Sequence, residues 1–114
     1  MEKIVKQSLL YDFYGELLTK HQRKIYEDAV FNDMSLSELS ENYNITRQGA
    51  HDIIKRCDKA LELYEDKLKL LEKTEAIREK AEDILKAASA DGAKASLNND
   101  KISKLAEEIL DLIG

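Results

Sequence analysis

Six polar side chains in one short stretch have the types and the spacing of a nucleic-acid contact. If the stretch is a helix, these side chains occupy positions on its outward-facing side. They are Arg47, Gln48, His51, Lys55, Arg56 and Lys59. Arginine can pair with the edge of guanine and glutamine with the edge of adenine, and each pair is worth ~1–3 kcal/mol of discrimination. The imidazole, the ammonium groups and the second guanidinium can contact phosphates. The stretch therefore predicts base contacts near its start and phosphate contacts further along.

Three carboxylates near this stretch oppose such a contact. Asp52 lies among the six residues, and Glu38 and Glu41 lie on the preceding predicted helix. Each repels phosphates, although Asp52 could instead accept a hydrogen bond from the amine of a cytosine. Because similar helical surfaces also bind proteins, the residues leave three interpretations open: contact with nucleic acid, contact with protein, or an inert scaffold.

The elements that must position these side chains form a predicted helix-turn-helix. Ser35 and Glu38 have the spacing of a capping box, which predicts a short helix over residues 36–43. Asn44 can adopt the left-handed conformation that ends a helix in a sharp turn. Thr46 is a suitable N-cap for the second helix, which carries the six residues. The motif also needs a small residue where the helices cross, and Ser40 meets this need. Apolar residues must pack between the two helices, and they are Leu36, Leu39, Ile45, Ala50 and Ile54.

The segments before this motif also have the pattern of helices. With no proline and only four glycines, the chain has few positions that interrupt a helix. Apolar spacing predicts helices over residues 3–18 and 20–32. The second of these opens with a capping box formed by Thr19 and Gln22.

The segments after the motif complete an all-α fold. The helix that begins at Arg47 has no evident stop before about residue 88, although Thr74 is a candidate bend. A small and polar stretch over residues 89–99 predicts a loop. A last amphipathic helix over residues 100–113 is expected to fold back onto the long helix.

The apolar pattern divides the chain and predicts a homodimer. We expect a helix-turn-helix domain over residues 1–72 and a helical extension over residues 73–114. The first helix is apolar around more than half of its circumference, and the long helix carries an apolar seam at three- and four-residue spacing. Both apolar surfaces must be buried against another helix. A second copy of the chain could bury either one, and the last helix of the same chain could bury the seam instead. The predicted interface is the seam, Leu61, Tyr64, Leu68 and Leu71, with the aromatic residues Tyr11 and Phe13 as the alternative.

Composition excludes several classes of function. The net charge of −5 rules out a strongly basic domain, so phosphate contacts would have to come from a local cluster. No apolar run is long enough to span a bilayer, and we expect a cytoplasmic protein with no membrane contact. One cysteine and two histidines make neither an internal disulfide nor a usual zinc site, and Cys57 is expected to be buried. With no glycine loop for phosphates and no Ser-His-Asp set, we expect no enzyme, cofactor or metal.

Three motifs resemble a known family of bacterial helix-turn-helix domains. They are LTKHQR at residues 18–23, SLSELSE at 35–41 and NITRQGA at 44–50. Together they are similar to the fourth region of sigma factors and to related winged or tetrahelical helix-turn-helix proteins. Over nearly the whole chain, and most clearly over residues 9–72, the sequence resembles the YlxM family, whose genes lie beside those of the signal recognition particle protein and its receptor.

The resemblance to the YlxM family implies a regulatory or accessory role in protein targeting by the signal recognition particle. That role would act through nucleic acid, such as the RNA of the particle, or through the signal recognition particle protein. The alternatives are a protein-interaction module that modulates the targeting GTPases without nucleic acid, and a DNA-binding transcriptional regulator. The acidic C-terminal part matches the family in character more than in motif.

Overall fold

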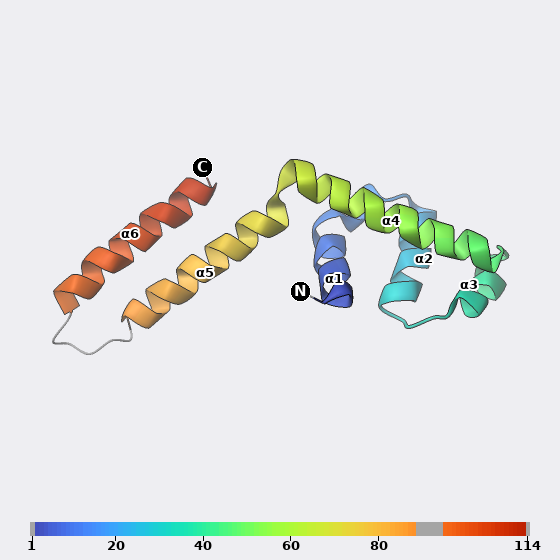
Figure 1. Cartoon of the computed structure of the whole chain (residues 1–114), viewed down its shortest axis with the longest axis horizontal. Coiled ribbons are helices and arrows are strands. Elements are labelled where there is room, and N and C mark those ends of the chain that lie inside the picture. Colours follow the sequence, from blue (N-terminus) through green and yellow to red (C-terminus); the bar gives the residue numbers. More distant parts are fainter. Residues whose placement is uncertain (1, 89–94, 114) are drawn as a thin grey trace. The chain divides into compact units, whose positions relative to one another are not determined.

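The computed structural model describes the backbone of residues 2–88 and 95–113 and the side chains of residues 2–88 and 100–113. In these residues every regular element is a helix, which confirms the predicted all-α class. The elements are α1 (Lys3–Tyr14), the 3-10 helix η1 (Gly15–Leu17), α2 (Lys20–Val30), α3 (Leu36–Tyr43), α4 (Arg47–Leu68), α5 (Leu70–Ala88) and α6 (Ala95–Ile113) (Figure 1). None of the described helices is both long and apolar enough to cross a membrane.

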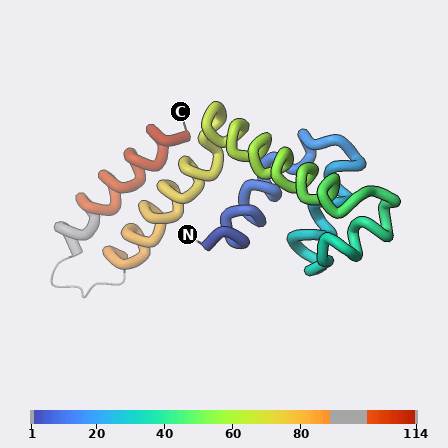
Figure 2. The backbone as a smooth tube through the Cα atoms, turned by 45° about the vertical axis from the view of Figure 1, so that its right-hand side comes forward, coloured from blue at the N-terminus to red at the C-terminus, as the bar shows by residue number. Residues whose placement is uncertain are grey.

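The chain forms two compact units, Met1–Lys69 and Leu70–Gly114, which are called unit 1 and unit 2 below. The division falls between Lys69 and Leu70, whereas we expected a boundary after residue 72. In unit 1, α4 passes across α1, α2 and α3, and Figure 2 shows the same crossing from a second direction. A long helix that supports three shorter ones gives unit 1 a core on one side of α4.

The core of unit 1 is made where α2, α3 and α4 meet. Ile25, Leu39 and Ala50 are completely buried and form one cluster. Four further residues expose at most 1% of their surface, and they are Tyr14, Tyr26, Cys57 and Leu61. Because burial of one large apolar side chain contributes roughly 1.5–3 kcal/mol, these contacts stabilise the angle between the helices.

Local capping sets the helix starts as the sequence predicts. Thr19 and Gln22 form a capping box at α2, and Ser35 and Glu38 form another at α3. Helix α3 has the expected bounds. Asn44 follows it in the left-handed region, with φ 53° and ψ 48°. The helix-turn-helix expected from the sequence is therefore present.

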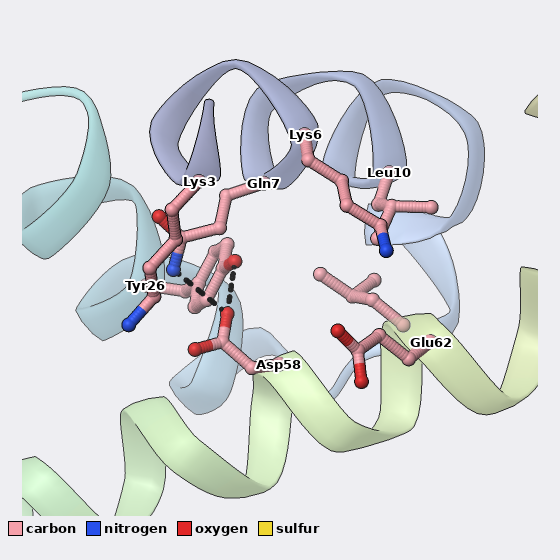
Figure 3. A pocket seen from close by; sticks show the side chains of 8 residues that line it. Lys3, Lys6, Gln7, Leu10, Tyr26, Asp58 and Glu62 are labelled. Carbon is pink, nitrogen blue, oxygen red and sulfur yellow. Dashed lines mark hydrogen bonds between the residues drawn. The ribbon is translucent and has the colours of Figure 1, made fainter. Parts of the chain in front are cut away.

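A polar cluster ties α1 and α2 to α4 (Figure 3). The Tyr26 hydroxyl donates to Asp58 Oδ1 at 2.6 Å, and Gln7 Nε2 donates to the same oxygen at 2.9 Å. Burial raises the pKa of Tyr26, and the hydrogen bond from Tyr26 to Asp58 raises it further. A cavity of about 80 Å³ lies beside the cluster between α1 and α4, with Lys6 and Glu62 among its lining residues.

The structure corrects three predicted helix boundaries near the start of the chain and in its middle. The first α-helix ends at Tyr14 rather than at residue 18, and a 3-10 turn follows it. Helix α2 ends at Val30 rather than at residue 32, because the chain turns so that Met34 N–H donates to the carbonyl of Asp28 at 3.0 Å. The long helix stops at Leu68, where Lys69 takes a positive φ of 59°.

Two further expectations beyond that break need correction. The helix is interrupted at Lys69 and not at the candidate bend Thr74, which lies inside α5. The predicted loop over residues 89–99 is too long, because α6 already begins at Ala95. The remainder of that predicted loop, residues 89–94, lies outside the described residues.

Unit 2 is a helical hairpin in which α5 and α6 lie side by side (Figures 1 and 2). In this hairpin the last helix packs against the helix before it. Ala87 and Leu105 are buried, and Lys80 Nζ lies 2.5 Å from Glu108 Oε2 across the pair. The hydrogen bond between the two groups, together with the attraction of their charges, raises the pKa of Lys80 and lowers the pKa of Glu108.

Candidate nucleic-acid interface

The start of α4 is held in place by hydrogen bonds within the turn that precedes it. Thr46 Oγ1 accepts from the N–H of Gly49 at 2.9 Å, which caps the helix as expected. A Cβ atom at Gly49 would lie 3.0 Å from this same oxygen, so a larger residue would crowd the cap. Ser40 Oγ donates to the carbonyl of Ile45 at 2.5 Å, so the small residue predicted at the crossing also anchors the turn.

One side of α4 packs into the core of unit 1, so only the opposite side is available to contact a ligand. Ala50 is completely buried, and Ile53 and Ile54 pack against the same cluster. Cys57 is completely buried one turn later. A helix buried along one stripe presents the residues of its opposite stripe to solvent.

The structure places five of the six predicted contact residues in solvent. Arg47, Gln48, Lys55, Arg56 and Lys59 are all exposed. The sixth, His51, keeps 42% of its side chain exposed, while its Nδ1 atom is buried and has no hydrogen-bond partner. His51 is therefore partly enclosed, and we retain it as a predicted contact residue.

The contact residues fall into two neighbouring rows, which we call the α4 rows. Residues four apart on a helix lie on one face, nearly one above the other. Three of the four members of the first row are basic and the fourth is the histidine, and the row is Arg47, His51, Lys55 and Lys59. The second row is Gln48, Asp52 and Arg56. Together the rows form a local cationic surface on a chain whose net charge is negative.

Asp52, which we expected to oppose phosphate contacts, is engaged by its neighbours. Gln48 Nε2 donates to Asp52 Oδ1 at 2.9 Å, and His51 Nδ1 lies 3.8 Å from the same oxygen. This relationship was missed from the sequence, although the four-residue spacing of a glutamine and an aspartate could have indicated it. The carboxylate is therefore hydrogen-bonded within α4, which the repulsion argument did not consider.

An open depression of about 440 Å³ lies beside the start of α4. It is lined by Leu36, Arg47, Gln48 and His51. Leu36 was expected to help close the angle of the helix-turn-helix, and it packs partly against the core while also lining this depression. The depression combines an apolar wall with groups that can donate or accept hydrogen bonds, which suits the edge of a base.

The two acidic residues of α3 differ in their surroundings. Glu38 Oε1 accepts from the N–H of Ser35 at 3.2 Å, so this carboxylate is used in the capping box. Glu41 is exposed. Each carboxylate would repel a phosphate group that came close to α3.

The seam residues predicted for dimerisation have unequal access to solvent. Leu61 is completely buried inside unit 1, which leaves it no surface for a second copy. Tyr64 is half-buried, with its ring centroid 6.1 Å from that of Tyr14. Leu68 is 48% exposed, and Leu71 is buried and belongs to unit 2.

The alternative aromatic residues also differ. Tyr11 stacks on Tyr26 with centroids 5.7 Å apart, and its hydroxyl donates to Glu27. Phe13 remains 36% exposed. Tyr11 is thus used within unit 1, whereas Phe13 still offers apolar surface, and the homodimer itself stays a prediction.

The described residues show no grouping suited to metal chemistry. Among them, no three His, Cys, Asp or Glu side chains gather in a way that could hold a metal ion. Cys57 is completely buried, as predicted. Burial, with a smaller effect of the neighbouring Asp58, raises the pKa of its thiol to about 11, which keeps it in the unreactive neutral form.

Comparisons with known proteins agree with the geometry of the helix-turn-helix. Residues 1–106 match the model of the family UPF0122, described as "Putative helix-turn-helix protein, YlxM / p13 like". A UPF0122 protein of Acetivibrio thermocellus is 42% identical over 114 residues, which cover 99% of this chain and 97% of the relative. One of Shouchella clausii is 38% identical over 92% of this chain and 98% of its own length. One of Caldanaerobacter subterraneus subsp. tengcongensis is 51% identical over 68% of this chain and 66% of its own length.

Proposed function

The chain belongs to the UPF0122 family of YlxM/p13-like helix-turn-helix proteins, and from this premise we propose that it binds nucleic acid through the N-terminal half of α4. The observation that carries the proposal is the exposure of the cationic α4 rows on the second helix of a helix-turn-helix. In such motifs the first turns of the second helix enter the major groove of DNA. Arg47 and Gln48 would contact base edges there, with Lys55, Arg56 and Lys59 on phosphates. The proposal requires no catalytic chemistry.

Local charge, rather than net charge, has to provide the affinity. A protein that neutralises phosphates releases condensed counterions, so its affinity falls steeply as salt rises. The α4 rows supply four guanidinium or ammonium groups, with His51 beside them and one carboxylate, Asp52, among them. Because the whole chain carries a charge of −5, we expect weak attraction at a distance and a contact confined to this surface.

We extend the proposal to a cytoplasmic accessory role in protein targeting, with the RNA of the signal recognition particle as the bound nucleic acid. The resemblance to the YlxM family supports this extension. The major groove of a regular RNA helix is too deep and narrow for side chains to read, so α4 would have to meet a loop, a bulge or an unpaired stretch. A DNA site recognised by a transcriptional regulator is the other form of the proposal.

Titration with nucleic acid at several salt concentrations tests the proposed contact. The full chain is titrated into labelled duplex DNA and into the particle RNA, and binding is followed by fluorescence anisotropy. We expect Arg47→Ala with Lys55→Ala to weaken binding at least about tenfold and to lower the salt slope by about two. The matched control is Arg78→Ala with Lys86→Ala, which removes the same charges from exposed positions of α5. Unchanged binding by the first pair would exclude this mode.

A second candidate is a protein-interaction module that adjusts the targeting GTPases. Exposed apolar side chains on α1 and η1 favour it, since Ile4 is 54% exposed, Phe13 36% and Leu17 56%. This function predicts binding to the signal recognition particle protein without RNA. A pull-down with nuclease-treated components separates the candidates, because the nucleic-acid function predicts loss of capture after nuclease treatment.

The homodimer is a separate proposal that either function could accommodate. Leu68 and Phe13 are the members of the predicted interface that offer the most apolar surface. Light scattering coupled to size-exclusion chromatography gives the mass in solution directly. We expect twice the chain mass of 13.0 kDa, and a monomer at all accessible concentrations would contradict the dimer.

A further inference from the structure

Gln48 and Asp52 are linked by a hydrogen bond on the exposed side of α4. Gln48 Nε2 donates to Asp52 Oδ1 at 2.9 Å across one turn of the helix. His51 Nδ1 lies 3.8 Å from the same oxygen. The carboxylate therefore has polar groups from two neighbours around it, and the Gln48 amide is restricted in the directions it can take.

The direction of this hydrogen bond decides what Gln48 can offer to a ligand. Because the amide nitrogen donates to Asp52, the amide oxygen of Gln48 is directed away from that carboxylate. One N–H of the amide is engaged, while the second N–H and the oxygen stay available. An N–H donor beside an oxygen acceptor is the pair that matches N7 and the exocyclic amine of adenine.

The depression at the start of α4 shows where that ligand edge would lie. Gln48 lines it together with Leu36, Arg47 and His51, whereas Asp52 does not. Asp52 thus holds Gln48 from outside the depression. This position separates the carboxylate from the base edge, although its charge still opposes nearby phosphates.

We propose that Asp52 is a positioning residue that orients the Gln48 amide to read a base with an exocyclic amine, adenine above all. The inference rests on the proposed function, because it assigns specificity to the same surface. A pre-oriented amide loses less freedom on binding, so discrimination between bases rises. The negative charge acts in the opposite direction on total affinity, because it repels phosphates whatever the sequence.

Two substitutions at Asp52 separate orientation from charge. Asp52→Asn removes the charge and keeps a carbonyl oxygen that can accept from Gln48, while Asp52→Ala removes both. The unaltered full chain first selects ligands from random-sequence duplex DNA and from random-sequence RNA. Affinities for the enriched sequence, for versions with single adenines replaced, and for the unselected pool are then compared among the variants. Thermal unfolding checks that each variant remains folded.

We expect Asp52→Ala to lower discrimination at one adenine by about two- to tenfold and to raise affinity for the unselected pool. Asp52→Asn should also raise affinity for the pool but keep the discrimination. In a Gln48→Ala background, Asp52→Ala should change discrimination no further.

Two results overturn the inference in distinguishable ways. If Asp52→Ala or Gln48→Ala keeps the discrimination of the unaltered chain, the positioning role is wrong while the proposed function stands. If the unaltered chain enriches no sequence from either library and binds neither pool at low salt, the proposed function and the positioning role both fall.

Discussion

The hydroxyl of Tyr26 on α2 and the carboxylate of Asp58 on α4 are joined by a hydrogen bond of 2.6 Å (Figure 3). Gln7 from α1 donates to the same oxygen at 2.9 Å, so one carboxylate receives hydrogen bonds from two other helices. In the sequence of α4, Asp58 lies between Lys55 and Lys59, which belong to the proposed contact surface. The helices behind that surface are therefore connected to it by polar contacts as well as by the apolar core.

The first prediction concerns this carboxylate. Tyr26→Phe removes a donor, and we expect the free energy of unfolding to fall by about 1–3 kcal/mol. Asp58→Ala should cost more, because it leaves the buried Tyr26 hydroxyl and the Gln7 amide without their acceptor. Urea unfolding of the full chain, followed by circular dichroism, measures both. Asp66→Ala, at an exposed position of the same helix, is the control and should change stability by less than about 0.5 kcal/mol.

The second prediction concerns the turn of the helix-turn-helix. Asn44 has a φ of 53°, and a left-handed conformation costs a residue with a Cβ atom roughly 1–2 kcal/mol, less for asparagine. Asn44→Ala should therefore lower stability by about 1 kcal/mol, and Asn44→Gly should leave it unchanged or raise it slightly. Asn42→Ala, inside α3, is the comparison and should be neutral or stabilising because alanine favours helix. Equal effects of Asn44→Ala and Asn44→Gly on the melting temperature would contradict this account.

The third prediction is a loss of stability in acid that depends on Asp28 and Tyr43. The Tyr43 hydroxyl donates to Asp28, and together with Asn32 it lowers the pKa of that carboxyl. A carboxyl whose pKa is lower in the folded state stabilises the fold above its unfolded pKa of about 3.9. This contribution is lost as the pH falls through the folded pKa, so Tyr43→Phe should unfold with a weaker dependence on pH below about 4.

The same pair predicts a loss of stability in alkali. The hydrogen bond to Asp28 and then burial raise the pKa of Tyr43 to about 12. A phenol whose pKa is raised by folding stabilises the fold below its unfolded pKa of about 10, and the contribution is lost as the pH rises through about 12. Melting temperatures of the unaltered chain and Tyr43→Phe across both ranges check the two signs. If the melting temperatures of the two proteins changed with pH in parallel, the hydrogen bond would not shift either pKa between the folded and unfolded states.

The fourth prediction concerns the single cysteine. Cys57 is completely buried and the pKa of its thiol is raised to about 11, so a thiol reagent at neutral pH should label it only when the chain opens. We expect the labelling rate to rise steeply in the urea range where the helical signal is lost. Rapid labelling of the native chain would show that this part of the core opens without global unfolding.

Several features of the fold and the candidate site could be predicted because they depend on a few neighbouring residues. The caps at Ser35 and Thr46 and the left-handed Asn44 were expected, since each is decided by hydrogen bonds or backbone sterics within about one turn. The exposure of Arg47 and Lys55 follows from helical periodicity once the core face is recognised. Their assignment to a nucleic-acid contact remains a prediction.

Other features have no local signal in the sequence. The helix that begins at Arg47 stops at Leu68, although the break has no proline or glycine and its capping residue is Lys69 in the left-handed region. Leu61 was expected at an interface and is instead buried in unit 1. The apolar pattern shows that a residue is expected to be buried, but it does not show which element it packs against.

By itself, the sequence determined the all-α class, the helix-turn-helix and the row of basic side chains, because propensity, capping and periodicity act over short distances along the chain. Only the tertiary structure decided where the long helix ends, that Asp58 joins three helices, and that the depression at α4 is shared with Leu36. The Asp58 cluster and the depression arise from contacts between segments distant in sequence, and their free energies depend on packing that no local pattern encodes. The end of the long helix has no proline or glycine that could have indicated it from the sequence.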